Sequence, residues 1–114
     1  MTGERLPAGL EARALMRAAE SQGGMGMLLQ KGDEERGSLL ILLLERGNTR
    51  FCLGRELSRS GTYEWADIGP SDLTDPIELQ GFLSKRRQYD PDLWIVELDL
   101  PDAESFRKET IFIS

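Results

Sequence analysis

Hydrophobic and polar positions along the chain predict a helix near the N-terminus, from about Pro7 to Gln22. Projected at 3.6 residues per turn, Arg13, Arg17 and Glu20 share one narrow side, and the rest of the surface is mostly alanine. Such short side chains allow a close approach to a sheet or another helix. The pair Gly23-Gly24 is typical of a helix end that needs positive φ.

Three strands are expected from the segments Met25 to Lys31, Ser38 to Arg46 and Thr62 to Ile68. The second contains six consecutive apolar residues, Leu39 to Leu44, which indicates a central strand covered on both faces. The third places Tyr63 and Trp65 on one side of the sheet, and its aromatic content favours a strand.

A tight hairpin is predicted at Gly47-Asn48, between the central strand and a further strand that follows it. Counting outward from this turn places Leu44 opposite Phe51 and Leu43 opposite Cys52. In that register Leu42 and Leu53 share the face of Leu44, and Cys52 is buried on the other face.

A second helix should begin at Asp75, with Pro76 in its first turn, and end near Tyr89. The last clear strand is Leu93 to Leu100, and a short helix is expected from Asp102. The fold class is therefore α+β: one domain over residues 1–114 in the order α-β-β-β-β-α-β, with a C-terminal tail. We expect a mainly antiparallel sheet of about five strands with two main helices, a core over about 6–100 and an extension over 101–114.

Composition excludes several classes of protein. The chain has 114 residues with one Cys and no His, so an internal disulfide and the commonest metal ligand are both ruled out. The run from Leu39 to Leu44 is far shorter than the ~20 residues of a membrane span. Residues 1–10 contain no apolar segment typical of a secretory signal, so a cytoplasmic location is expected. We predict no cofactor and no metal.

Charge is distributed unevenly along the sequence. The net charge is −6, and residues 61–114 carry five basic and twelve acidic side chains. A nucleic-acid partner is therefore disfavoured, because phosphate binding needs clustered Lys and Arg.

Two segments resemble a known family. Lys31-Gly32-Asp33, and above all the stretch Asp90-Pro91-Asp92-Leu93-Trp94-Ile95-Val96-Glu97, are similar to domain-of-unknown-function family 1491, small proteins of alphaproteobacteria. The similarity covers roughly residues 6–100. It implies a bacterial cytoplasmic setting and these domain limits, and it carries no activity, substrate or catalytic residue.

Several residues suit either a chemical or a structural role. Asp90 and Asp92, or Asp33 with the following Glu34-Glu35, have carboxylates suited to a divalent cation or to acid/base work, but Asp beside Pro or Gly is also typical of turns. Cys52 lacks a His to activate it, which favours a buried inert thiol. The run Gly23 to Gly26 follows a helix, the reverse of the order found in phosphate loops, which favours a helix stop.

The remaining candidates are basic and aromatic. Lys85, Arg86 and Arg87 lie near a helix C-terminus, where they either bind an acidic group or offset the helix dipole. Trp94 is expected in the core, whereas Trp65, between Glu64 and Ala66, is the better candidate for recognition. The predicted interaction surface is formed by Arg55, Arg59, Trp65, Lys85, Arg86 and Arg87.

Three hypotheses about function follow. A non-catalytic protein-interaction or regulatory module ranks first, a small carboxylate-based or metal-dependent enzyme second, and a nucleic-acid-associated protein third. A cleft that gathers Asp33, Asp90 and Asp92 would favour the second. A continuous face of Arg13, Arg17 and the cluster 85–87 would favour the third. Because the central strand needs cover on both faces, we also expect either helices on opposite faces or a homodimer.

Overall fold

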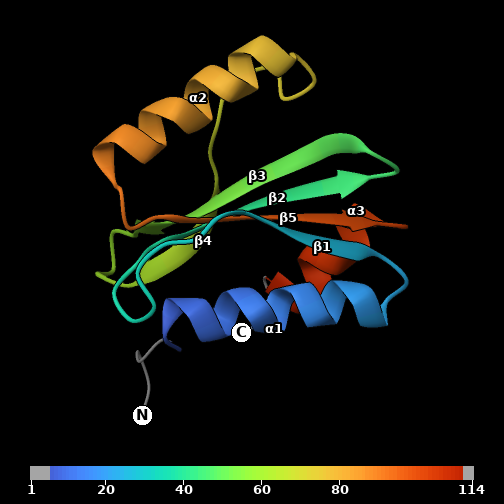
Figure 1. The fold of residues 1–114 in the computed structure, drawn as a ribbon, viewed down its shortest axis with the longest axis horizontal. Coiled ribbons are helices and arrows are strands. Elements are labelled where there is room, and N and C mark those ends of the chain that lie inside the picture. The colour runs from blue at the N-terminus through green and yellow to red at the C-terminus, as the bar shows by residue number, and fades with distance from the viewer. Residues whose placement is uncertain (1–5, 112–114) are drawn as a thin grey trace.

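Helices cover both faces of a central β-sheet in the computed structural model of the protein, which describes residues 6–111 (Figure 1). The elements follow in the order α1 (Ala8–Ser21), β1 (Met25–Gln30), β2 (Leu39–Glu45), β3 (Asn48–Leu57), β4 (Tyr63–Asp67), α2 (Pro76–Tyr89), β5 (Trp94–Leu100), α3 (Ala103–Phe106) and the π-helical turn η1 (Arg107–Ile111). The predicted helices and strands are confirmed, including the short helix after Asp102. Among the described residues, no helix has both the length and the apolar character needed to cross a membrane.

The five strands form one mixed sheet in the order β1-β5-β2-β3-β4. Strands β2 and β5 run parallel at its centre, and the other three pairings are antiparallel. The α+β class and the five strands are confirmed. The sheet is not purely antiparallel, because β5 returns after α2 to lie between β1 and β2, and a third helix follows it.

The central position of β2 is confirmed by its burial, since its residues Leu39 to Leu44 are all buried. On one face, Ala12 and Ala19 of α1 pack over Ile41 and Leu43. On the other face, α2 contributes Leu79 and Leu83 to a second core cluster, with Leu40, Leu42, Leu44, Cys52, Leu93 and Ile95. The two main helices therefore divide between the faces of the sheet (Figure 1), which supplies from one chain the cover that the central strand needs.

The predicted hairpin register is wrong by one residue. The turn consists of Arg46 and Gly47, which both have positive φ (51° and 83°), and Glu45 pairs with Asn48. An irregularity between Leu43 and Leu44 then shifts the ladder, so that Leu43 opposes Phe51 and Leu42 opposes Cys52.

This shift decides which core each side chain enters. Cys52 is buried as predicted, but on the α2 face together with Leu42 and Leu44. Leu53 and Phe51 lie on the α1 face instead. The turn comes one residue earlier in the chain than predicted, with Gly47, which adopts positive φ readily, as its second residue. Beyond the turn, the bulge determines which side chains of β3 enter each core.

The C-terminal segment closes the α1 face. Asp102 caps α3 by accepting a hydrogen bond from the Ser105 amide at 3.0 Å, and Glu45 accepts one from the Ala103 amide at 3.0 Å. Phe106 and Ile111 are buried in the core beside α1. The apolar residues Ile111, Phe112 and Ile113 are the expected end of the C-terminal tail, and of these Phe112 and Ile113 lie outside the described residues.

Candidate interaction surface

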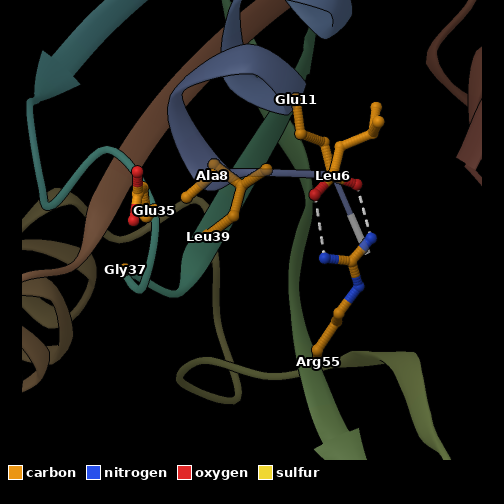
Figure 2. A pocket seen from close by; sticks show the side chains of 7 residues that line it. All are labelled: Leu6, Ala8, Glu11, Glu35, Gly37, Leu39 and Arg55. Carbon is orange, nitrogen blue, oxygen red and sulfur yellow. Dashed lines mark hydrogen bonds and ion pairs between the residues drawn. The ribbon is translucent and has the colours of Figure 1, made fainter. Parts of the chain in front are cut away.

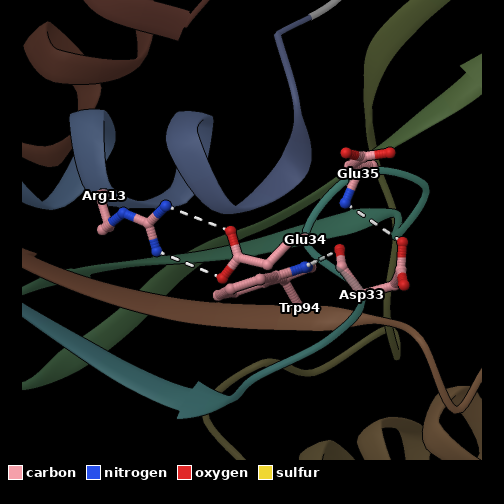
Figure 3. A network of polar contacts seen from close by, with 5 residues as sticks. All are labelled: Arg13, Asp33, Glu34, Glu35 and Trp94. Atoms are coloured by element: carbon pink, nitrogen blue, oxygen red, sulfur yellow. Dashed lines mark hydrogen bonds and ion pairs between the residues drawn. The ribbon is translucent and has the colours of Figure 1, made fainter.

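The two segments that carry the family resemblance, 31–33 and 90–97, lie in contact. The indole Nε1 of Trp94 donates a hydrogen bond to the Asp33 carbonyl at 2.6 Å (Figure 3), and the Asp33 amide donates to the Asp92 carbonyl at 3.1 Å. A Cβ on Gly32 or Gly37 would stand 2.0 or 2.3 Å from that Asp92 oxygen. Trp94 is buried, so its predicted place in the core is confirmed, and the contact needs glycine at both positions.

Three of the candidate carboxylates, those of Asp33, Asp90 and Glu34, already have partners within the fold. Asp33 accepts hydrogen bonds from the amides of Glu35 (3.1 Å) and Arg36 (2.6 Å), and Asp90 accepts one from the Asp92 amide at 3.1 Å. Glu34 forms an ion pair with Arg13 of α1 at 3.2 Å (Figure 3). Within residues 6–111, no three His, Cys, Asp or Glu side chains are placed to hold a metal ion.

Arg55 on β3 is held between α1 and β4. Its Nη1 donates to Oε1 of Glu11 at 2.9 Å, and its Nη2 donates to Oε2 of the same carboxylate (Figure 2). The guanidinium carbon of Arg55 lies 4.3 Å from the ring centroid of Trp65, the residue opposite it on β4. The side chains of Arg55 and Glu11 are each only 17% exposed, so Arg55 is fixed by a bidentate ion pair and by a cation–π contact.

A cavity of about 220 Å³ opens beside this ion pair, at the start of α1 (Figure 2). Leu6, Ala8 and Leu39 line it, but its exposed lining is mainly polar, and Glu35 adds a second carboxylate to that of Glu11. The remaining lining residues are Gly37 and Arg55.

Exposed apolar residues extend this region toward the tip of the β3–β4 hairpin. Leu57 and Tyr63 are paired across the hairpin and are 62% and 61% exposed. They lie on the same face as Arg55 and Trp65, because alternate residues of a strand share a face. Arg59 is exposed in the connecting turn, which the Ser58 amide closes by donating to the Thr62 carbonyl at 2.7 Å. We call Arg55, Leu57, Arg59, Tyr63 and Trp65 the hairpin surface.

Leu57 and Tyr63 were not among the residues predicted for binding. Each stands two positions from a residue that was, Arg55 or Trp65. The strand alternation of period two, applied outward from these residues, was the signal that could have found them.

The structure does not bring the predicted basic cluster to the hairpin surface. Lys85, Arg86 and Arg87 lie in the last turns of α2, on the opposite face of the sheet (Figure 1). Arg86 lies over the Phe82 ring at 5.7 Å from its centroid, and Lys85 is exposed. Arg13 and Arg17 belong to α1, so they form no continuous basic face with the α2 cluster.

Cys52 and the glycine run that begins at Gly23 have structural roles. Burial raises the pKa of the Cys52 thiol to about 12, despite the opposing effect of Arg86, so the thiol is protonated at neutral pH. Gly23 has a φ of +87° and donates to the Glu20 carbonyl at the end of α1. This confirms the glycine run as a helix stop.

Comparison with known proteins gives a family and a fold. The model of a family described as "Protein of unknown function (DUF1491)" matches residues 6–108. The crystal structure of a DUF1491 family protein from Caulobacter crescentus is similar with a TM-score of 0.74 and 25% identity, over 87% of this chain and 92% of that one. An NMR structure of a DUF1491 family protein from the same organism gives 0.74 and 26%, over 89% and 91%.

A solution structure of a protein from A. tumefaciens shares the fold, with a TM-score of 0.70 and 20% identity over 87% of this chain and 89% of that one. No curated protein matches the sequence.

Proposed function

Because the chain belongs to the DUF1491 family, which is described only as of unknown function, we propose a function from its geometry: it is a non-catalytic module that binds a protein through the hairpin surface and the adjoining cavity. The observation that carries the proposal is Arg55, fixed between Glu11 and Trp65 at the border of that cavity. A side chain already ordered before binding loses little conformational freedom when a partner docks.

The composition of the hairpin surface supports this proposal. Arg, Trp and Tyr are the residues that most often carry binding energy in protein interfaces. Leu57 and Tyr63 offer apolar area that the described part of the chain leaves more than half exposed. Arg59 adds a cation at the tip of the hairpin.

The cavity suggests the chemistry of the partner. Its exposed lining is mainly polar and includes Arg55 and the carboxylates of Glu11 and Glu35. Because Glu11 is already paired with Arg55, a Lys or Arg side chain of the partner would pair with the Glu35 carboxylate. The excess of acidic residues in the chain would also steer a basic partner toward it at low salt.

The two alternative hypotheses have weaker support. The carboxylates of Asp33 and Asp90 already accept hydrogen bonds from their own turns, which disfavours a role for them in acid/base chemistry. The basic residues of α1 and those of α2 lie on opposite faces of the sheet, which disfavours a nucleic-acid surface.

Affinity capture from an alphaproteobacterial lysate tests the proposal when it is run with variants in parallel. We expect Leu57→Ala and Arg59→Ala each to weaken capture of the same partner about tenfold, corresponding to roughly 1.4 kcal/mol. Tyr89→Ala, which removes an 87% exposed ring from α2, is the matched control and should leave capture unchanged. Circular dichroism of each variant verifies that the fold is retained.

A partner that binds both hairpin variants as well as the native protein would contradict the proposal. So would a metal-dependent or substrate-dependent turnover that Asp92→Asn abolishes, since that result would favour the carboxylate-based enzyme.

A further inference from the structure

β1 is an edge strand that carries exposed apolar side chains. Within residues 6–111 it pairs only with β5 and ends the sheet on that side (Figure 1). Met25 is 68% exposed, Met27 52% and Leu28 40%. An unpaired edge of this kind presents backbone N–H and C=O groups to any extended chain that can pair with it.

The sequence around this edge differs from the rest of the protein. Ser21–Gln30 is the longest stretch without a charged residue in a chain that is 30% charged. Proteins usually protect an edge strand with charged residues or Pro, and β1 has neither. Its one irregularity lies after Leu28, so Met25–Leu28 remains a regular segment available for pairing.

The two faces of β1 differ in their cover. Gly26 lies against α1, where an added Cβ would stand 2.7 Å from the side chain of Met16. Met25 and Met27 oppose Asp99 and Glu97 of β5, on the face that bears α2. The exposed methionines are therefore the apolar surface left open at this edge.

We propose that β1 pairs antiparallel with β1 of a second copy of this chain, about a two-fold axis perpendicular to the sheet and centred on Met27. Opposed residues of an antiparallel pair point to the same face, so Met27 of each copy would lie against Met27 of the other. Leu28 of each copy would then lie beside Gly26 of the other. The two sheets would continue into one.

Charge favours this edge over the other one for a second copy. The acidic pair Glu97 and Asp99 lies one strand inward, so the two copies of β5 would be about 14 Å apart, at three strand spacings of ~4.8 Å. That separation exceeds the Debye length of ~8 Å at physiological salt, so the repulsion is largely screened. β4, by contrast, carries Glu64 and Asp67 within five residues, and such charged side chains protect an edge strand against pairing, whereas β1 has no charged residue.

Light scattering coupled to gel filtration tests the proposal on the full chain. At about 100 µM protein we expect a mass of twice 12.8 kDa. Met27→Glu, at a half-exposed position, should raise the dissociation constant at least about tenfold, because it places two carboxylates side by side at the two-fold axis and opposes each to Glu97 of its own copy. Glu64→Lys on β4 is the matched edge control and should leave the dimer intact.

Circular dichroism and thermal melting separate loss of pairing from loss of fold, and Met25→Glu, at a more exposed position, serves as a second variant. A single species of 12.8 kDa throughout would overturn the proposal. A dimer that both glutamate variants of β1 leave intact would overturn it too. Neither result bears on the hairpin surface, which lies at the other edge of the sheet.

Discussion

At the scale of single residues, burial decides what each of the two ion pairs of α1 contributes to stability. The side chains of Arg55 and Glu11 are 17% exposed, whereas those of Arg13 and Glu34 are 49% and 48% exposed. Arg55→Ala would leave the Glu11 carboxylate without its partner at a position that is only 17% exposed and would remove the contact with Trp65. We expect it to lower the free energy of unfolding by about 2–3 kcal/mol in urea denaturation.

The exposed pair provides the comparison within the same helix. Water and salt screen it, so Arg13→Ala should cost less than about 1 kcal/mol. Equal losses for Arg55→Ala and Arg13→Ala would show that burial of the Glu11 pair contributes nothing.

The roles of Arg55 and Trp65 could be predicted only in part. Their residue types indicated binding energy, and the structure does place the two side chains against each other. Arg55 was predicted as a surface contact, because no local pattern shows that Glu11, 44 positions earlier, packs against β3. Long-range partners of this kind depend on the tertiary fold, which hydrophobic periodicity and secondary-structure propensity do not specify.

At the scale of elements, the hydrogen bond from Trp94 holds the loop between β1 and β2 against the start of β5. Trp94→Phe keeps most of the buried ring but removes the indole donor, so the Asp33 carbonyl loses its 2.6 Å partner. We expect a loss of about 1–2 kcal/mol in unfolding free energy. Amide exchange of Asp33 and Gly37 should accelerate, because these amides hydrogen-bond within the same contact.

Tyr89→Phe is a suitable control, since it removes a polar atom from a side chain that is 87% exposed. Amides of the loop that exchange at the native rate in Trp94→Phe would show that other contacts hold the loop in place.

Element boundaries were predictable because their signals are local. Asp75 accepts hydrogen bonds from the amides of Ile77 (2.9 Å) and Glu78 (3.3 Å), as expected of a helix cap at that position. The parallel pairing of β2 with β5 was not predictable, because the alternation of apolar and polar residues identifies a strand but not the strand that pairs with it. The predicted hairpin register was wrong for a related reason. Placing Arg46 at positive φ costs conformational energy, and the packing of β3 into two cores offsets this cost.

At the scale of the whole molecule, the two proposed surfaces lie at opposite edges of one sheet. β1 ends the sheet on one side, and β4, which carries Tyr63 and Trp65, ends it on the other. Pairing through β1 would therefore leave both hairpin surfaces of a dimer free at its outer ends. Such a dimer would engage a repetitive partner at two points, and its overall affinity would exceed that of a single site.

The C-terminal segment packs into the core that α1 shares with the sheet, so we expect the two to unfold together. Phe106 is fully buried in the core beneath α1, and Arg107 pairs with Asp67 at 2.6 Å and stacks on Phe51 at 4.6 Å. Phe106→Ala should cost about 3–5 kcal/mol, a large part of the 5–15 kcal/mol typical of a small domain. Because the cavity left by the missing phenyl ring would lie in the core shared with α1 and β2, urea denaturation followed by fluorescence and by circular dichroism should give one coincident transition at a lower midpoint.

Tyr89→Ala, at an exposed aromatic position, is the control and should shift that midpoint little. A loss below about 1 kcal/mol in Phe106→Ala, or a separate early transition in the native protein, would mean that the segment after β5 is an independent appendage and not part of the core.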